Sequence, residues 1–184
     1  MQKVERVPID DELLGGGGEE GGGGGGGAPA PPLLRDDGSV RALVAAERAA
    51  GLDRASTFVG WSASIDRKGL ELSSLLRGLK GAGLRVAAYG APAKATTLMY
   101  HFGIDSSLVE YVMDDNPLKQ GLYTPGLHVP VVAPDALLSE DEATRPDYVV
   151  VLAWNFARSI IDSHAEFARR GGRWIVPLPD LYVC

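Results

Sequence analysis

The chain has 184 residues, a formal net charge of −6 and no run of basic residues. An acidic chain without a basic patch disfavours duplex nucleic acid and anionic membrane surfaces as partners. The single cysteine, Cys184, has no partner for an internal disulfide, and the sequence shows neither a signal peptide nor an apolar stretch of membrane-spanning length. We therefore expect a cytoplasmic protein that has neither nucleic acid nor a membrane as its partner.

Residues 1–37 differ in composition from the rest of the chain. Residues 15–27 are glycine except for Glu19 and Glu20, and residues 28–32 read Ala-Pro-Ala-Pro-Pro. Glycine loses the most backbone entropy on ordering and has no side chain to bury, so this low-complexity segment is predicted to be a disordered, flexible linker. The packed domain is expected over residues 38–184, a length of about 145 residues that suffices for one core.

The spacing of apolar residues predicts two helices before the first strand. The first covers residues 40–50, with Ser39 as its N-cap and Gly51 after its end. The second is longer and covers residues 58–80. Its apolar positions have the period of a stripe that packs against a flat surface, and they are Ile65, Leu72, Leu75, Leu76 and Leu79.

Strands and helices are predicted to alternate from residue 85 onward. The strands are residues 85–89, 109–113, 148–152 and 173–176, and the helices are residues 93–102, 134–138 and 155–170. Continuous runs of Val, Ile and Leu between helices are typical of a parallel sheet that is covered on both faces. We therefore expect an α/β fold: a Rossmann-like half with a four-stranded, mainly parallel sheet, helices on both faces and a long helix in front of it.

The segment that follows the first predicted strand is a candidate phosphate site. Gly90 leads through Ala91 and Pro92 into a helix, whose unpaired amides and positive dipole end favour an anion. Lys94, in the first turn, would repel that dipole unless a negative group lay between them. Pro92 stands at the second glycine of a dinucleotide fingerprint and has no N–H, which disfavours NAD. A plain strand-to-helix turn with a solvated lysine is the alternative.

A second candidate segment follows the strand predicted at residues 109–113. Asp114 lies about two dozen residues beyond Gly90, where a Rossmann unit places the carboxylate that accepts hydrogen bonds from a ribose. Asn116 and the proline after it favour a turn, and Lys119 and Gln120 offer donors nearby. The alternative is a turn-rich connection whose charges are only solvated.

The remaining polar residues are less specific. His128 could transfer a proton or contact a phosphate, or it could be a structural loop residue. Trp154 and Asn155 could form a pocket wall, or they could serve packing and helix capping alone. The sequence contains no histidine or cysteine pair with metal-ligand spacing, no nucleophile elbow and no P-loop ending. We therefore expect neither a metal site nor a catalytic residue in this chain.

Several of these segments occur in the order typical of a known family. They are residues 89–97 (Tyr-Gly-Ala-Pro-Ala-Lys-Ala-Thr-Thr), 114–121 (Asp-Asp-Asn-Pro-Leu-Lys-Gln-Gly), 154–155 (Trp-Asn) and 171–173 (Gly-Gly-Arg). Together they resemble the C-terminal domain of bacterial C-methyltransferases that depend on S-adenosylmethionine (SAM) and methylate deoxysugars attached to nucleoside diphosphates. The resemblance extends over residues 38–179.

The resemblance implies a nucleoside-diphosphate sugar as ligand and a separate SAM-binding methyltransferase domain as partner. SAM would belong to that domain and not to this chain, which shows no SAM loop and is expected to be inactive alone. The substrate site is expected to include Tyr89, Gly90, Ala93, Lys94, Thr96, Thr97, Asp114, Asn116, Lys119, Gln120, His128, Trp154 and Asn155. Two other interpretations stay open: an NAD- or CoA-type Rossmann enzyme, and a non-catalytic interaction module whose long helix docks to a partner.

Overall fold

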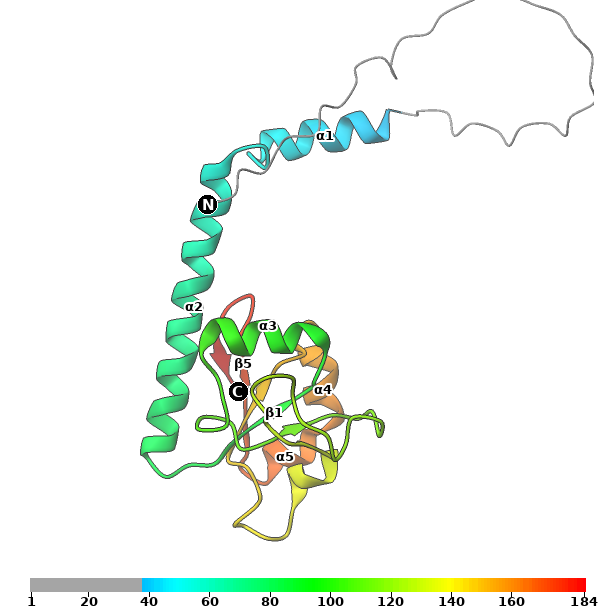
Figure 1. Cartoon of the computed structure of the whole chain (residues 1–184). Coiled ribbons are helices and arrows are strands. Elements are labelled where there is room, and N and C mark those ends of the chain that lie inside the picture. The colour runs from blue at the N-terminus through cyan, green and yellow to red at the C-terminus, as the bar shows by residue number, and fades with distance from the viewer. Residues whose placement is uncertain (1–37) are drawn as a thin grey trace, which may run out of the picture. The chain divides into compact units, whose positions relative to one another are not determined.

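The computed structural model describes residues 38–184, so the linker predicted over residues 1–37 lies outside the described residues. The chain divides into two units, Met1–Ala45 and Ala46–Cys184. Helix α1 (Ser39–Ala49) crosses that boundary, has no buried residue and matches the helix predicted over residues 40–50. The second unit is an α/β structure (Figure 1). None of the described helices combines the length and apolarity that a bilayer crossing requires.

The sheet has six strands in the order β3-β2-β1-β4-β5-β6. They are β1 (Val86–Tyr89), β2 (Val112–Met113), β3 (Val131–Val132), β4 (Tyr148–Val151), β5 (Arg173–Val176) and β6 (Tyr182–Val183). All neighbours are parallel except β5 and β6, which pair antiparallel. The strand order reverses between β1 and β4, which is where open α/β sheets place their ligands.

Two strands were not expected from the sequence. Strands β3 and β6 have two residues each, and the strand predicted at residues 109–113 is paired only over Val112–Met113. Such short strands form because a neighbouring strand offers free backbone groups, and no local apolar run of the usual length marks them. The expectation of a mainly parallel sheet is confirmed, with six strands and not four.

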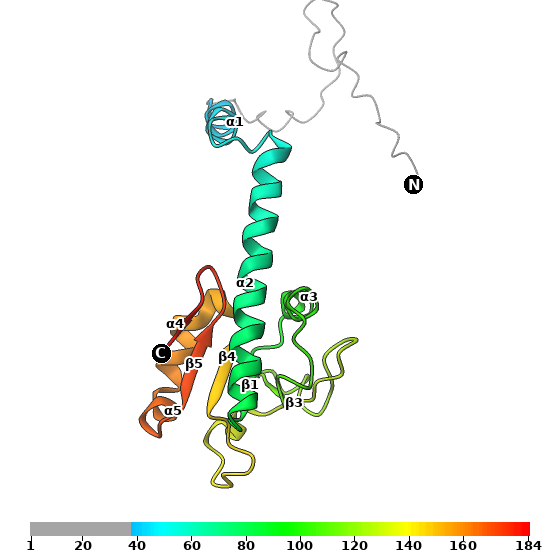
Figure 2. The ribbon, with the colours of Figure 1, turned by 90° about the vertical axis from the view of Figure 1, so that its left-hand side faces the viewer.

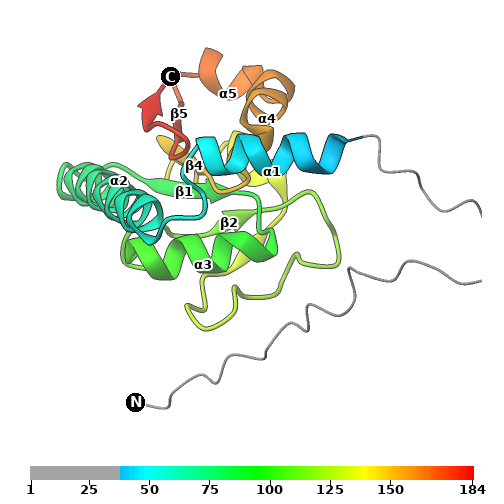
Figure 3. The ribbon, with the colours of Figure 1, turned by 90° about the horizontal axis from the view of Figure 1, so that it is seen from above.

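Successive residues of β1 point to opposite faces of the sheet, and each face has its own core. Val86 and Ala88 pack into the core under α2 (Ala55–Gly81) and α3 (Ala93–Phe102). Ala87 and Tyr89 pack into the other core, with residues of α4 (Ala157–Ser163), α5 (Ala165–Arg169) and the short 3₁₀ helix η2 (Pro134–Leu138). Figure 3 shows α2 and α3 on one side of the strands and α4 and α5 on the other.

The helix predicted over residues 155–170 is broken into three pieces. The 3₁₀ helix η3 (Trp154–Phe156) leads into α4, and α5 begins after His164. The backbone of His164 leaves the helical region (φ −118°, ψ 35°), and its Nδ1 lies 2.9 Å from the carbonyl oxygen of Ile160. The imidazole also packs edge to face on Tyr89, so a contact with the sheet accompanies the break.

Helix α2 is packed along only part of its length. Leu72 and Leu76 are fully buried in the core, as the stripe predicted. Nε2 of His101 lies 2.9 Å from Oδ1 of Asp66, and an ion pair joins Lys68 to Asp180 (2.7 Å), a residue in the loop after β5. The residues before Asp66 extend beyond this level and stand clear of the sheet and α3 (Figures 1 and 2). We call residues 55–65 the overhang.

Candidate functional site

The candidate residues gather where the parallel strands end, and the loop after β1 determines their arrangement. Gly90 adopts a positive φ of 88°, and a Cβ atom placed on it would lie 2.7 Å from the Cβ of Ala153. Only glycine therefore allows the loops after β1 and β4 to approach this closely. Pro92, in extended conformation, then begins α3, and no side chain caps that helix.

Lys94 reaches across the point where the strand order reverses. Its Nζ donates a hydrogen bond to Oδ1 of Asn155 and lies 4.0 Å from the centre of the Trp154 ring. A cation over the face of an indole ring is attracted by the ring quadrupole. Lys94, Trp154 and Asn155 are thus brought together, and in this structure they satisfy one another.

Asp114 joins the ends of β1 and β2. Its Oδ2 accepts hydrogen bonds from the N–H of Ala91 (2.7 Å) and from Nζ of Lys119 (3.0 Å). Its Oδ1 accepts the N–H of Asn116 at 2.9 Å, and Gln120 donates to its backbone carbonyl at 3.0 Å. Burial opposes ionisation of this side chain, but the two N–H donors and the ammonium group outweigh it and lower the pKa of Asp114.

Each oxygen of the Asp114 carboxylate thus has a partner within the chain, and the residue is 8% exposed. A ribose would have to displace these donors or share them. The arrangement makes Asp114 an anchor for the loop after β2.

The neighbouring carboxylate fastens the same loop to the other face of the sheet. The hydroxyl of Tyr89 donates to Oδ1 of Asp115 (2.7 Å) and lies 3.2 Å from Nε2 of His164. Burial and the nearby Asp115 carboxylate raise the pKa of Tyr89 well above its usual value, so this phenol is neutral near pH 7. Asp115 was not among the site residues predicted from the sequence, and its link through Tyr89 to His164 was not expected.

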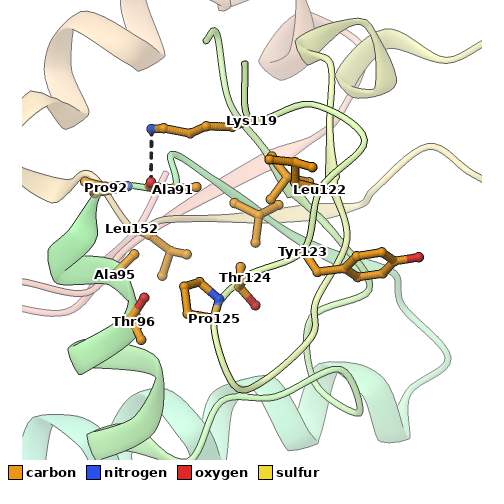
Figure 4. A pocket seen from close by; sticks show the side chains of 12 residues that line it. Ala91, Pro92, Ala95, Thr96, Lys119, Leu122, Tyr123, Thr124, Pro125 and Leu152 are labelled. Atoms are coloured by element: carbon orange, nitrogen blue, oxygen red, sulfur yellow. Dashed lines mark hydrogen bonds between the residues drawn. The ribbon is translucent and has the colours of Figure 1, made fainter. Parts of the chain in front are cut away.

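A cavity of about 220 Å³ lies between the start of α3 and the loop after β2. Its wall is mostly apolar and includes Ala91, Pro92, Ala95, Thr96, Val112, Lys119, Leu122, Tyr123, Thr124, Pro125, Val131 and Leu152. In Figure 4, Lys119 extends across the upper side and donates to the carbonyl of Ala91 at 3.0 Å, while Thr96 faces Pro125. The cavity thus offers a hydrocarbon surface with hydroxyl groups and one ammonium group at its wall.

Sequence reasoning identified only part of this wall. Thr96 and Lys119 were candidates and line the cavity, whereas the stretch Leu122–Pro125 was not assigned a role. Tyr123-Thr124-Pro125-Gly126 is a turn sequence, and it folds back toward α3: a Cβ on Gly126 would collide with the hydroxyl of Tyr100. The turn sequence can be recognised in the chain, but Tyr100, the residue that the turn contacts, lies in α3.

The other candidates lie outside the cavity wall. Ala93 and Thr97 are exposed on α3, and Lys94 lies at Asn155. His128 is exposed, has a positive φ of 52° and borders a shallow hollow together with Tyr123. Within residues 38–184 no group of three or more His, Cys, Asp or Glu side chains could hold a metal ion.

Comparisons with known proteins identify the family of the chain. The family model described as the C-methyltransferase C-terminal domain matches residues 34–179. The chain belongs to this family. It is also 34% identical over 142 residues to the C-methyltransferase NovU of Streptomyces niveus, and the similar region is 77% of this chain and 33% of NovU. The chain thus corresponds to about a third of the length of that relative.

Proposed function

We propose that this Rossmann-like domain binds the sugar nucleotide that a SAM-dependent C-methyltransferase methylates, and that SAM binds to another domain. Family membership supports a role beside a methyltransferase. The main observation in favour is the cavity between α3 and the loop after β2, because it lies at the carboxyl ends of β1 and β2.

The size of the cavity limits what it can hold. Pockets for drug-sized ligands measure roughly 300–1,000 Å³, and this cavity measures about 220 Å³. It therefore accommodates one ring and not a whole nucleoside-diphosphate sugar. We assign the deoxysugar ring to it, because its mostly apolar wall suits a sugar that has lost a hydroxyl, and Thr96, Thr124 and Lys119 can donate hydrogen bonds to those that remain.

The diphosphate would then pass the first turn of α3. There the amides of Ala93 and Lys94 begin a helix that no side chain caps. Lys94 would give up its hydrogen bond to the neutral oxygen of Asn155 and donate to a phosphate oxygen instead. A hydrogen bond from an ammonium group to a charged phosphate is stronger than one to a neutral amide. NAD and CoA fit less well, because Pro92 removes an amide from the loop and the Asp114 carboxylate already has partners.

Isothermal titration of the chain with a panel of nucleoside-diphosphate sugars tests this proposal. Heat is expected from at least one sugar nucleotide, and none from NAD or CoA. Thr96→Leu, which fills the cavity, should weaken binding at least tenfold, whereas Thr97→Leu on the exposed side of the same helix turn should not. If no sugar nucleotide binds, or if the two variants behave alike, the proposal is wrong.

A further inference from the structure

The overhang is an unusual helix surface for a solvent-exposed segment. No Asp, Glu, Lys or Arg occurs between Arg54 and Asp66. Phe58 and Trp61 are 49% and 53% exposed and pack on each other, with ring centres 5.3 Å apart. A helix that is uncharged all round is normally covered by protein on most sides.

The exposed apolar residues of the overhang continue the stripe that packs on the sheet. At about 100° per residue, Phe58, Trp61 and Ile65 lie on the same face of α2 as Gly69, Leu72 and Leu76. The latter three are buried, whereas Ile65 is 44% exposed. The same face of the helix thus covers the core in one half and has no cover from the described residues in the other (Figure 2).

The loops around the cavity expose apolar side chains too. Leu118 is 82% exposed and Leu122 57%, both in the loop after β2, and Phe156 after β4 is 62% exposed. An occupant of the overhang would lie on the side of α2 that faces α3, the helix that lines the cavity with Ala95 and Thr96 (Figure 1).

We propose that the overhang is the docking surface for the methyl-donor domain of a C-methyltransferase. This inference rests on the proposed function, since methyl transfer requires that domain to approach a sugar in the cavity. The similarity covers 33% of NovU, so most of that relative lies outside it and includes enough chain for another domain. A domain held by Phe58, Trp61 and Ile65 would stand beside α3, the helix whose first turns line the cavity with Ala95 and Thr96.

Docking can be measured without any sugar nucleotide. The probe is the part of NovU outside the region similar to this chain, titrated with the full chain in analytical ultracentrifugation. A complex of one copy of each is expected. Trp61→Glu and Phe58→Glu should each weaken it at least tenfold, because both place a charge in the stripe. Leu70→Glu is the matched control, since Leu70 is exposed on α2 about 120° away from the stripe.

Other occupants give other results. If the chain alone forms dimers that Trp61→Glu dissociates, the overhang binds a second copy and the proposal is wrong. If acrylamide quenches the emission of the monomer no more than that of Trp61→Phe, which retains Trp154 and Trp174, the stripe is covered within the chain and the proposal is wrong again. The proposal is also wrong if no complex forms, or if Leu70→Glu weakens the complex as much as Trp61→Glu and Phe58→Glu do. Since docking needs no sugar, its failure is distinguishable from a failure of the titrations with sugar nucleotides.

Discussion

The two ends of the sheet expose different chemistry. At the amino ends of the strands, charged side chains pair with one another: Glu110 binds Lys80 and Arg85, and Arg170 binds Glu140 and Glu166. At the carboxyl ends the main charge pair is Asp114 with Lys119, and it is surrounded by the cavity and by exposed apolar side chains. Charged side chains that pair with one another suit an end that meets water, whereas exposed apolar surface indicates contact with another molecule.

Helix α2 runs past both ends and allows the comparison to be tested within one helix. Leu76→Ala removes a fully buried side chain near the amino end and should lower the free energy of unfolding by about 2–5 kcal/mol. Ile65→Ala, in the same stripe but within the overhang, should change it by less than about 0.5 kcal/mol. Urea denaturation measures both. A large cost at Ile65 would mean that the overhang is packed within the chain.

The charge pairs of the two ends should also differ in strength. Asp114→Ala leaves the amides of Ala91 and Asn116 without their acceptor and the Lys119 ammonium with only the Ala91 carbonyl, and it should cost about 2–4 kcal/mol. Glu140→Ala removes a partner of Arg170 whose side chain is 89% exposed, so the cost should stay below about 0.5 kcal/mol. Equal midpoint shifts in urea would contradict the distinction between an anchoring pair and a solvated one.

Two glycines of α2 give a third contrast, with opposite signs. A Cβ on Gly69 would lie 2.5 Å from Cδ1 of Phe102, so Gly69→Ala should destabilise the chain by about 1–3 kcal/mol. Gly60 in the overhang has nothing within 4 Å of such an atom, and Gly60→Ala should stabilise by about 0.5–1 kcal/mol through its higher helix propensity. Thermal unfolding monitored by circular dichroism distinguishes the two. A loss of stability at Gly60 would place a hidden contact on the overhang.

The elements that could be predicted are those specified by local sequence. Strand β1 and helix α3 were expected almost residue for residue, because an apolar run ends at Gly90 and a helical pattern ends at Gly103, whose φ of 62° is that of a C-terminal cap. The break at His164 was missed, since the contact that accompanies it is with Tyr89 on another element. The two-residue strands were missed for a similar reason: their pairing and not their composition defines them.

The site shows the same division. Its place at the carboxyl ends of the strands followed from the fold class, and Asp114, Lys119 and Thr96 were named from the sequence. That Lys94 would find Asn155, which is 61 positions away, or that the stretch Leu122–Pro125 would form the opposite wall, depends on how the loops close. Such contacts between distant residues cannot be predicted from the local sequence.

The smallest expected effect concerns pH. The folded chain lowers the pKa of Asp114 below its unfolded value of about 3.9, so the stabilisation from its ionised form is complete above that value and is lost as the pH falls through the folded pKa. The difference in unfolding free energy between wild type and Asp114→Asn should therefore be constant from pH 7 to about pH 5 and shrink below about pH 4. Taking the difference cancels the other titrating groups, including the ion pairs at the amino ends of the strands. A difference that grew on acidification would mean that the Asp114 carboxylate is strained in the folded chain. Asp114 could then no longer be the anchor that explains the position of the cavity wall at the carboxyl end of the sheet.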